Sequence, residues 1–129
     1  MVALQNMLQY LKKHVKIPDD MDWDLAASLP VTSLTAYHAL KETGLKLNEY
    51  PLVFGASGSA GMMAVQLSKR MRAKVIAVSK DEWIKDFEAD YIIKHYDRVV
   101  EQVKEITHGK MADVVLNSLG VNTWDREPE

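Results

Sequence analysis

The sequence has no cysteine and no excess of charge of one sign, and both absences limit its function. Without cysteine the chain forms neither a disulfide framework nor a thiolate zinc site, which is compatible with a reducing cytosol. Its 16 basic and 18 acidic residues give a formal charge of -2, so general electrostatics favour neither nucleic acid nor an anionic membrane as partner. An anionic ligand must therefore be recognised locally.

Long apolar runs are also missing from the chain. Its apolar stretches are far shorter than the ~20 residues of a membrane helix, and the N-terminus lacks the basic, apolar and small-residue order of a signal peptide. We therefore expect a soluble, cytoplasmic protein without a membrane partner. The 129 residues, 47% of them apolar, predict one folded domain over 1–129.

The first part of the chain has helical periodicity. Within 1–16, apolar residues recur at three- and four-residue intervals, which predicts an amphipathic N-terminal helix. These residues are Leu4, Met7, Leu8, Leu11 and Val15. Further on, Asp22 is expected to cap a short helix, and Pro30 suits the start of another helix near Val31, which Gly44 ends.

After residue 48 the pattern alternates between strands and helices. The predicted strands cover 50–54, 74–78, 91–94 and 113–117, and the helices between them cover 59–71, 81–88 and 97–107. Strands rich in Val and Ile without polar alternation are buried on both faces, and intervening helices make them parallel. We predict an α/β fold, a Rossmann-like parallel sheet of order 3-2-1-4 with flanking helices.

A glycine turn joins the first predicted strand to the helix that follows. A strand, a glycine turn and a helix start place backbone N–H groups against a pyrophosphate, so a dinucleotide is the predicted cofactor. A side chain at Gly58 would keep the phosphates away, and one at Gly61 would hold the helix off the strand. The alternative is a purely structural turn. The candidate cofactor-binding residues are Gly55, Ala56, Ser57, Gly58, Ser59, Ala60 and Gly61.

The end of the second predicted strand indicates which dinucleotide is bound. Ser79 stands where an acidic residue would hold a ribose 2′-hydroxyl, and Lys80 follows it. Without that carboxylate a 2′-phosphate is not repelled, and Lys80 with the Ser79 hydroxyl would bind it, so NADP(H) is preferred over NAD(H). The alternative is that Ser79 caps the next helix and Lys80 is solvated. A methyltransferase using the same turn would require an acidic residue here.

Four segments carry a family resemblance: 29–40, 52–61, 73–79 and 112–118. They resemble the coenzyme domain of medium-chain dehydrogenases/reductases, which include zinc-type alcohol dehydrogenases and zinc-independent quinone oxidoreductases. The resemblance extends over 17–124. It implies that Thr35 lies near the nicotinamide, and Asn117 with Leu119 near its ribose. The structural alternatives are a Thr35 hydroxyl bonded to a preceding carbonyl and a strand-end turn at Asn117.

Departures from the family pattern limit what the resemblance implies. Val31 occupies the position of a cysteine zinc ligand, so no zinc is expected. Most of the family's catalytic domain and its last two strands have no counterpart, so the chain resembles a truncated or shortened member whose catalytic residues are unknown. Arg72 and Glu88 replace the usual glycines after two helices, and we expect altered helix ends or a redesigned chain.

Two functional hypotheses follow. The first is the NADP(H)-binding domain of a zinc-independent oxidoreductase that transfers hydride between nicotinamide and a carbonyl, alcohol or quinone in the full-length enzyme. Whether this chain is itself an enzyme stays open. The second is a non-catalytic nucleotide-binding or scaffold fragment that associates with itself through the exposed edge of the fourth strand. A homo-oligomer through that edge is compatible with either.

Overall fold

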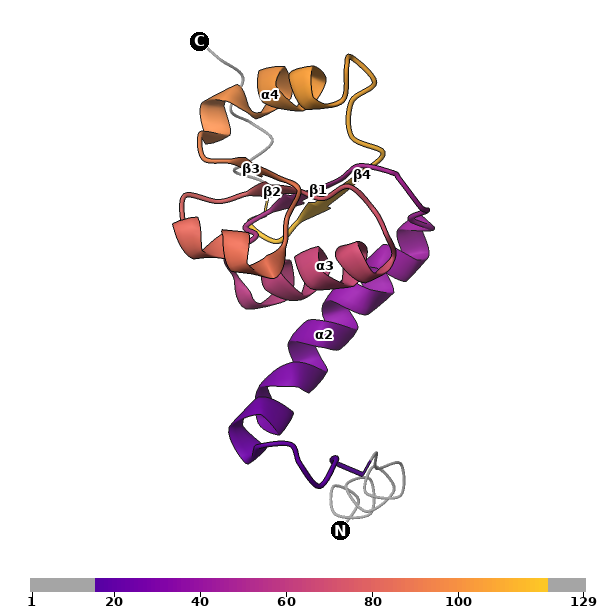
Figure 1. Cartoon of the computed structure of the whole chain (residues 1–129), viewed down its shortest axis with the longest axis vertical. Coiled ribbons are helices and arrows are strands. Elements are labelled where there is room, and N and C mark those ends of the chain that lie inside the picture. Colours follow the sequence, from indigo (N-terminus) through magenta and orange to yellow (C-terminus); the bar gives the residue numbers. More distant parts are fainter. Residues whose placement is uncertain (1–15, 121–129) are drawn as a thin grey trace.

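The computed structural model describes residues 16–120, which form a parallel sheet between two helical layers (Figure 1). One layer contains α2 (Trp23–Thr43), α3 (Ser59–Arg70) and the 3-10 helix η1 (Glu82–Phe87). The other contains the short 3-10 helix η2 (Tyr96–Arg98) and α4 (Val99–Ile106). The helix predicted within 1–16 and the last residues of the chain fall outside the described range, apart from residue 16. Within that range no helix is both long and apolar enough to cross a lipid bilayer.

The sheet has the predicted topology. Its strands are β1 (Pro51–Phe54), β2 (Ile76–Val78), β3 (Tyr91–Ile93) and β4 (Val114–Asn117). Their order is β3-β2-β1-β4, and every neighbouring pair is parallel. The prediction of a Rossmann-like α/β fold of order 3-2-1-4 is therefore confirmed. Since Phe54 pairs with Val78 on one side and Asn117 on the other, the carboxyl ends of three strands meet beside the glycine turn.

Side-chain alternation along the central strands builds two cores. Val53 on β1 and Ala77 on β2 belong to the core under α2 and α3. Leu52 and Phe54 belong to the opposite core, which α4 covers. All residues of β1 and β2 are buried, as expected for parallel strands with helices on both faces.

The predicted division of the early helical region at Pro30 is wrong. α2 is one helix of 21 residues with Pro30 inside it, although Asp22 caps its start and Gly44, at φ 65°, ends it as predicted. Pro30 has no N–H, so α2 lacks one backbone hydrogen bond at this position and no more. A side-chain contact remains in the same turns, since the Thr32 hydroxyl donates to the Ser28 carbonyl at 3.0 Å. The second half of α2 packs on α3 through Ala36 and Leu40, and this tertiary contact outweighs the local preference.

Two later helical predictions also differ in detail. The segment predicted as a helix over 81–88 is the 3-10 helix η1, and the predicted helix over 97–107 begins with the tighter turns of η2 before α4. Both stretches are short, and a 3-10 geometry is common in short connecting helices.

The helix stops at Arg72 and Glu88 keep their left-handed geometry without glycine. Their φ angles are 59° and 61°. The Arg72 amide donates to Lys69 at 2.9 Å, and the Glu88 amide donates to Lys85 at 3.1 Å. The expectation of altered helix ends is therefore wrong, because these side chains are exposed and the conformation costs only ~1 kcal/mol.

Replacing Arg72 with glycine should stabilise the fold. Arg72→Gly removes the strain of a left-handed non-glycine residue, which stabilises the folded chain, but it also raises the conformational entropy of the unfolded chain. We expect a net rise in the free energy of unfolding of about 0.5 kcal/mol. Arg70→Gly, in the last turn of α3, should lower it by about 1 kcal/mol, since Arg70 is helical. Urea titration measures both changes. Equal losses in the two variants would contradict the assignment of strain to Arg72.

An aspartate anchors the start of the central strand. The Tyr50 amide donates to the Asp113 carboxylate at 2.8 Å, and Lys110 lies 2.9 Å from its other oxygen. The Tyr50 hydrogen bond, and then the Lys110 charge, hold the pKa of Asp113 below its ordinary value of 3.8. The ionised carboxylate therefore joins the entry of β4 to the entry of β1.

The Asp113 contact makes stability depend on pH. Because its pKa is lower in the folded chain, its contribution is complete above pH 3.8 and is lost as the pH falls through the folded value. Asp113→Asn should lower the free energy of unfolding by about 1 kcal/mol at pH 7 and have little effect near pH 2. The exposed Asp86→Asn is the control. If Asp113→Asn lowers the free energy of unfolding by the same amount near pH 2 as at pH 7, the ionised carboxylate is not the source of the stabilisation.

Candidate functional site

The candidate site begins where β1 ends in the glycine turn. Gly55 has a φ of 64°, and a Cβ there would lie 2.8 Å from side-chain atoms of both Ser118 and Leu119. The Gly58 amide donates to the Gly55 carbonyl at 2.9 Å and closes the turn. The chain thus turns sharply between β1 and α3 at the carboxyl edge of the sheet.

Gly61 lets the first turn of α3 touch that loop. A Cβ on Gly61 would overlap the Gly55 carbonyl oxygen and lie 2.8 Å from the Ala56 Cα atom. Both obstacles are backbone, so they cannot move aside without moving the turn. The predicted role of Gly61 in close packing between helix and strand is therefore confirmed.

The N-terminus of α3 has unsatisfied donors. Its cap residue is Gly58, which has no side chain to accept a hydrogen bond from the first turn. The amides of Ser59 and Ala60 have no acceptor within residues 16–120, because helical bonding starts further along the chain. These donors, at the positive end of a helix dipole, form an arrangement that binds anions.

A cavity of about 450 Å³ lies beside these amides and is called the turn cavity. Its wall consists of Gly55, Ser57, Gly58, Ser59, Ala60, Tyr96, Ser118 and Leu119. The Tyr96 hydroxyl donates to the Val78 carbonyl at 3.4 Å, and its ring packs against Phe54. Burial, and then the nearby charge of Asp81, raise the pKa of Tyr96 above its ordinary value. The Tyr96 side chain that lines the cavity is therefore uncharged at physiological pH.

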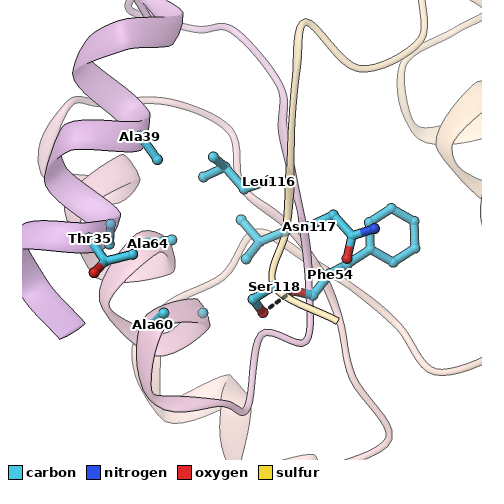
Figure 2. Close-up of a pocket in the computed structure, with 11 residues that line it drawn as sticks. Thr35, Ala39, Phe54, Ala60, Ala64, Leu116, Asn117 and Ser118 are labelled. Carbon is cyan, nitrogen blue, oxygen red and sulfur yellow. Dashed lines mark hydrogen bonds between the residues drawn. The ribbon is translucent and has the colours of Figure 1, made fainter. Parts of the chain in front are cut away.

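A second cavity of about 150 Å³, the helix cavity, lies between α2, α3 and β4. It is lined mostly by small and apolar residues: Thr35, Ala36, Ala39, Val53, Phe54, Ala60, Gly61, Ala64, Leu116, Asn117 and Ser118. Figure 2 shows Leu116 and Ser118 facing Thr35, Ala60 and Ala64 across this space. Ala60 and Ser118 line both cavities, so the two spaces adjoin at the start of α3.

Thr35 and Asn117 line the helix cavity, with their polar groups engaged. The Thr35 hydroxyl donates to the Val31 carbonyl at 2.7 Å, which leaves its lone pairs to accept. The Asn117 side chain accepts from the Leu119 amide at 2.9 Å and donates to Gly120 at 3.1 Å. In Figure 2 its amide lies beside the Phe54 ring, away from Thr35. Both structural alternatives are thus present in the geometry.

The remaining predicted residues line neither cavity. Ala56 is fully buried, and Ser79 is buried at the end of β2 with its hydroxyl accepting from the Asp81 amide at 3.1 Å. Asp81, not Ser79, is the cap residue of η1. Lys80 is exposed and has no hydrogen-bond or ion-pair partner among the described residues.

One residue of the site, Ser118, was not among the predicted ones, whereas the position of Tyr96 after the third predicted strand indicated either an adenine contact or a capping turn. Ser118 donates to the Phe54 carbonyl at 3.1 Å and thereby ties the end of β4 to the end of β1. Tyr96 follows β3 at the same edge of the sheet. Their only sequence signal is position, since the carboxyl ends of parallel strands gather at one edge. Within residues 16–120, no three His, Asp or Glu side chains cluster as metal ligands would.

Comparison with known proteins identifies the family. A model of the zinc-binding dehydrogenase family matches residues 60–127, more than half of the chain. The chain belongs to the medium-chain dehydrogenase/reductase family. The predicted membership in this family is confirmed.

Similar proteins within the medium-chain dehydrogenase/reductase family differ greatly in length. The quinone oxidoreductase of Salmonella typhimurium is 33% identical over 115 residues, covering 84% of this chain and 35% of that protein. The highly reducing polyketide synthase phiA of a fungal species is 35% identical over 114 residues, covering 81% of this chain and 4% of the synthase. The chain therefore spans about a third of the one relative and a small part of the other.

Solved structures of the family match in fold as well. The quinone oxidoreductase of Thermus thermophilus, described also in its complex with NADPH, matches with a TM-score of 0.75 at 29% identity. That match covers 84% of this chain and 37% of the Thermus protein. The chain therefore shares the four-stranded parallel sheet of its structural neighbours in the medium-chain dehydrogenase/reductase family.

The two helix-start glycines should differ sharply in tolerance to alanine. Gly61→Ala should lower the free energy of unfolding by about 2–3 kcal/mol, since its Cβ meets backbone. Gly58→Ala should cost less than about 1 kcal/mol, because Gly58 has an ordinary extended φ of -73° and its Cβ would lie 3.2 Å from one oxygen. Urea unfolding compares them. If the two variants lose similar free energies of unfolding, the backbone contact at Gly61 is not what excludes a side chain there.

Proposed function

We propose that this chain is the NADP(H)-binding domain of a zinc-independent medium-chain oxidoreductase. In the full-length enzyme it would transfer hydride between nicotinamide and a carbonyl, alcohol or quinone. One observation carries the proposal: the uncapped N-terminus of α3 opens onto the turn cavity at the end of β1. In an α/β sheet, this is where a dinucleotide pyrophosphate is bound.

The residues present fit a pyrophosphate. The amides of Ser59 and Ala60 have no acceptor within the described chain, and the missing side chain of Gly58 leaves room for phosphate oxygens to approach. The Ser57 and Ser59 hydroxyls supply further donors from the same cavity wall. Tyr96 and Leu119 line the same cavity and place apolar surface beside the proposed phosphate position.

The helix cavity supports binding of the nicotinamide half. It adjoins the turn cavity at Ala60 and Ser118, and its small residues leave space for a planar ring. Thr35 presents hydroxyl lone pairs that would accept from the carboxamide, and Asn117 and Leu119 would lie near the ribose. When bound, the cofactor supplies the hydride, while the chain binds and orients it.

Lys80 favours NADP(H) over NAD(H). Its ammonium is exposed at the end of β2 without a partner among the described residues, so it would bind a 2′-phosphate without losing an existing ion pair. Ser79, although buried, still has a hydroxyl proton to donate. Asp81 acts in the opposite direction, since its carboxylate lies nearby. The NADPH complex described for the Thermus quinone oxidoreductase supports the preference.

Zinc independence and the assembly state belong to the same proposal. The chain has no cysteine, and Val31 occupies the position where zinc members of the family have a cysteine ligand. Self-association would use the outer edge of β4, whose one neighbour among the described strands is β1 and whose Val115 is exposed. The quinone substrate class is supported by the Salmonella relative. We expect the protein to be cytoplasmic.

Cofactor titration of the full chain tests this function. Calorimetric titration should give saturable binding of NADPH that is tighter than that of NADH. Lys80→Ala should weaken NADPH binding about tenfold and leave NADH unchanged, because a charge-assisted contact is worth about 1.4 kcal/mol. Lys104→Ala, an exposed lysine of α4, is the matched control and should change neither affinity.

Gly58→Leu tests the pyrophosphate cradle itself. A leucine side chain at the cap of α3 would occupy the phosphate position, so both nucleotides should lose measurable binding while the chain stays folded by circular dichroism. Absence of binding by the unmodified chain at millimolar NADPH would overturn the proposed function and favour the non-catalytic scaffold. Equal affinity for NADH and NADPH would overturn the cofactor preference alone.

A further inference from the structure

The outward face of α2 is apolar where a surface helix is ordinarily charged. Four large side chains on it are exposed: Trp23 (78%), Val31 (77%), Leu34 (54%) and Tyr37 (42%). With the exposed Ala27 and Pro30 they occupy about a third of the helix circumference, and we call these six residues the α2 stripe. Figure 1 shows that the first half of α2 extends away from the sheet, so nothing else in the described chain lies against it.

The α2 stripe is separate from the surface that packs on the domain. Ala36 and Leu40 are buried against α3, on the side of the helix opposite to Trp23 and Leu34. The helix is therefore apolar on two opposite faces, and only one of them is covered. An exposed apolar surface of this kind marks a place where other protein packs.

We propose that the segment 4–15 of the same chain covers the α2 stripe as an antiparallel helix. The segment has its own apolar face, and its residues match those of the stripe one by one. From Leu4 to Val15, successive apolar residues of the segment are 3, 1, 3 and 4 positions apart. The residues of the stripe, taken in reverse order from Leu34 to Trp23, have the same spacing. The matched pairs are Leu4 with Leu34, Met7 with Val31, Leu8 with Pro30, Leu11 with Ala27, and Val15 with Trp23.

The connection between the two segments suits such a hairpin. Residues 16–22 join them, and seven residues are within the usual range for linked antiparallel helices. The Met21 amide donates to the Pro18 carbonyl at 3.1 Å, which forms a tight turn in the middle of the linker. Such a turn reverses the chain where an antiparallel helix requires it.

Charge complementarity favours the same occupant. The segment carries Lys12 and Lys13 at its C-terminal end and has no acidic residue. In the proposed register this end lies beside the start of α2, where Asp22 caps the helix and Asp24 occupies the first turn. Lys12, which borders the apolar face of the segment, would then lie near these aspartates, and the negative end of one helix dipole would lie beside the positive end of the other.

Paired cysteines in the full chain test the proposed contact, because the natural sequence has no other thiol. Met7→Cys combined with Val31→Cys should form an intramolecular disulfide under mild oxidation. Asn6→Cys combined with Val31→Cys is the matched control, since residue 6 is adjacent in sequence but on the other side of the segment. We expect the first pair to close on the order of tenfold faster, through its higher effective concentration. Non-reducing electrophoresis and mass spectrometry measure both products.

Each other outcome of this experiment contradicts the proposal. Equal closure rates in the two pairs would mean that the segment has no fixed face toward α2. If Val31→Cys alone forms disulfide-linked dimers, and the Met7→Cys and Val31→Cys pair also gives dimers rather than the intramolecular bond, the stripe binds a second copy of the chain. Circular dichroism of each reduced variant checks folding, which should be retained because the side chain of Val31 is exposed.

Discussion

The structure depends most on the backbone contact between α3 and the glycine turn. Gly61 has no room for a side chain because the Gly55 carbonyl lies against it, so the first turn of α3 packs directly on the turn that follows β1. The same approach leaves the first amides of α3 beside the turn cavity, and Gly58 contributes no side chain to satisfy them. Close packing and open donors are therefore consequences of one constraint, which suits a site that must bind a phosphate through its backbone.

Backbone amides have carboxylate acceptors at the amino edge of the sheet, but those of the first turn of α3 at the carboxyl edge do not. At the amino edge, the buried Val75 amide donates to Asp90 at 2.6 Å and the Tyr50 amide donates to Asp113 at 2.8 Å, each carboxylate being paired with a lysine. At the carboxyl edge, the first turn of α3 has no such carboxylate. The chain thus uses its own charges to fix the strand entries and leaves the positive end of α3 without a carboxylate, as the proposed function requires.

The sheet could be predicted from the sequence because its signals are local and agree with one another. Val- and Ile-rich runs, separated by helical stretches, predicted the strand order, and glycine spacing predicted the contact at Gly61. The wrong boundary at Pro30 arose where a local rule met a tertiary contact through Ala36 and Leu40. Ser118 could not be selected in the same way, since its role depends on strand ends that meet only in the folded sheet. The roles assigned to Thr35, Ser79, Lys80 and Asn117 remain predictions.

α2 connects these features, because its two faces are apolar for different reasons. On the domain side, Ala36 and Ala39 are small, which lets α2 approach α3 and still leaves the helix cavity open. On the outer side, Trp23, Val31 and Leu34 are too large to be left uncovered at no cost. Since Ala36 and Ala39 line the cavity on the side of α2 away from the stripe, covering the stripe would stabilise α2 without closing the candidate cofactor site. The proposed covering of α2 and the proposed cofactor site therefore depend largely on different faces of one helix, and changes at Trp23 and at Ala39 separate the two.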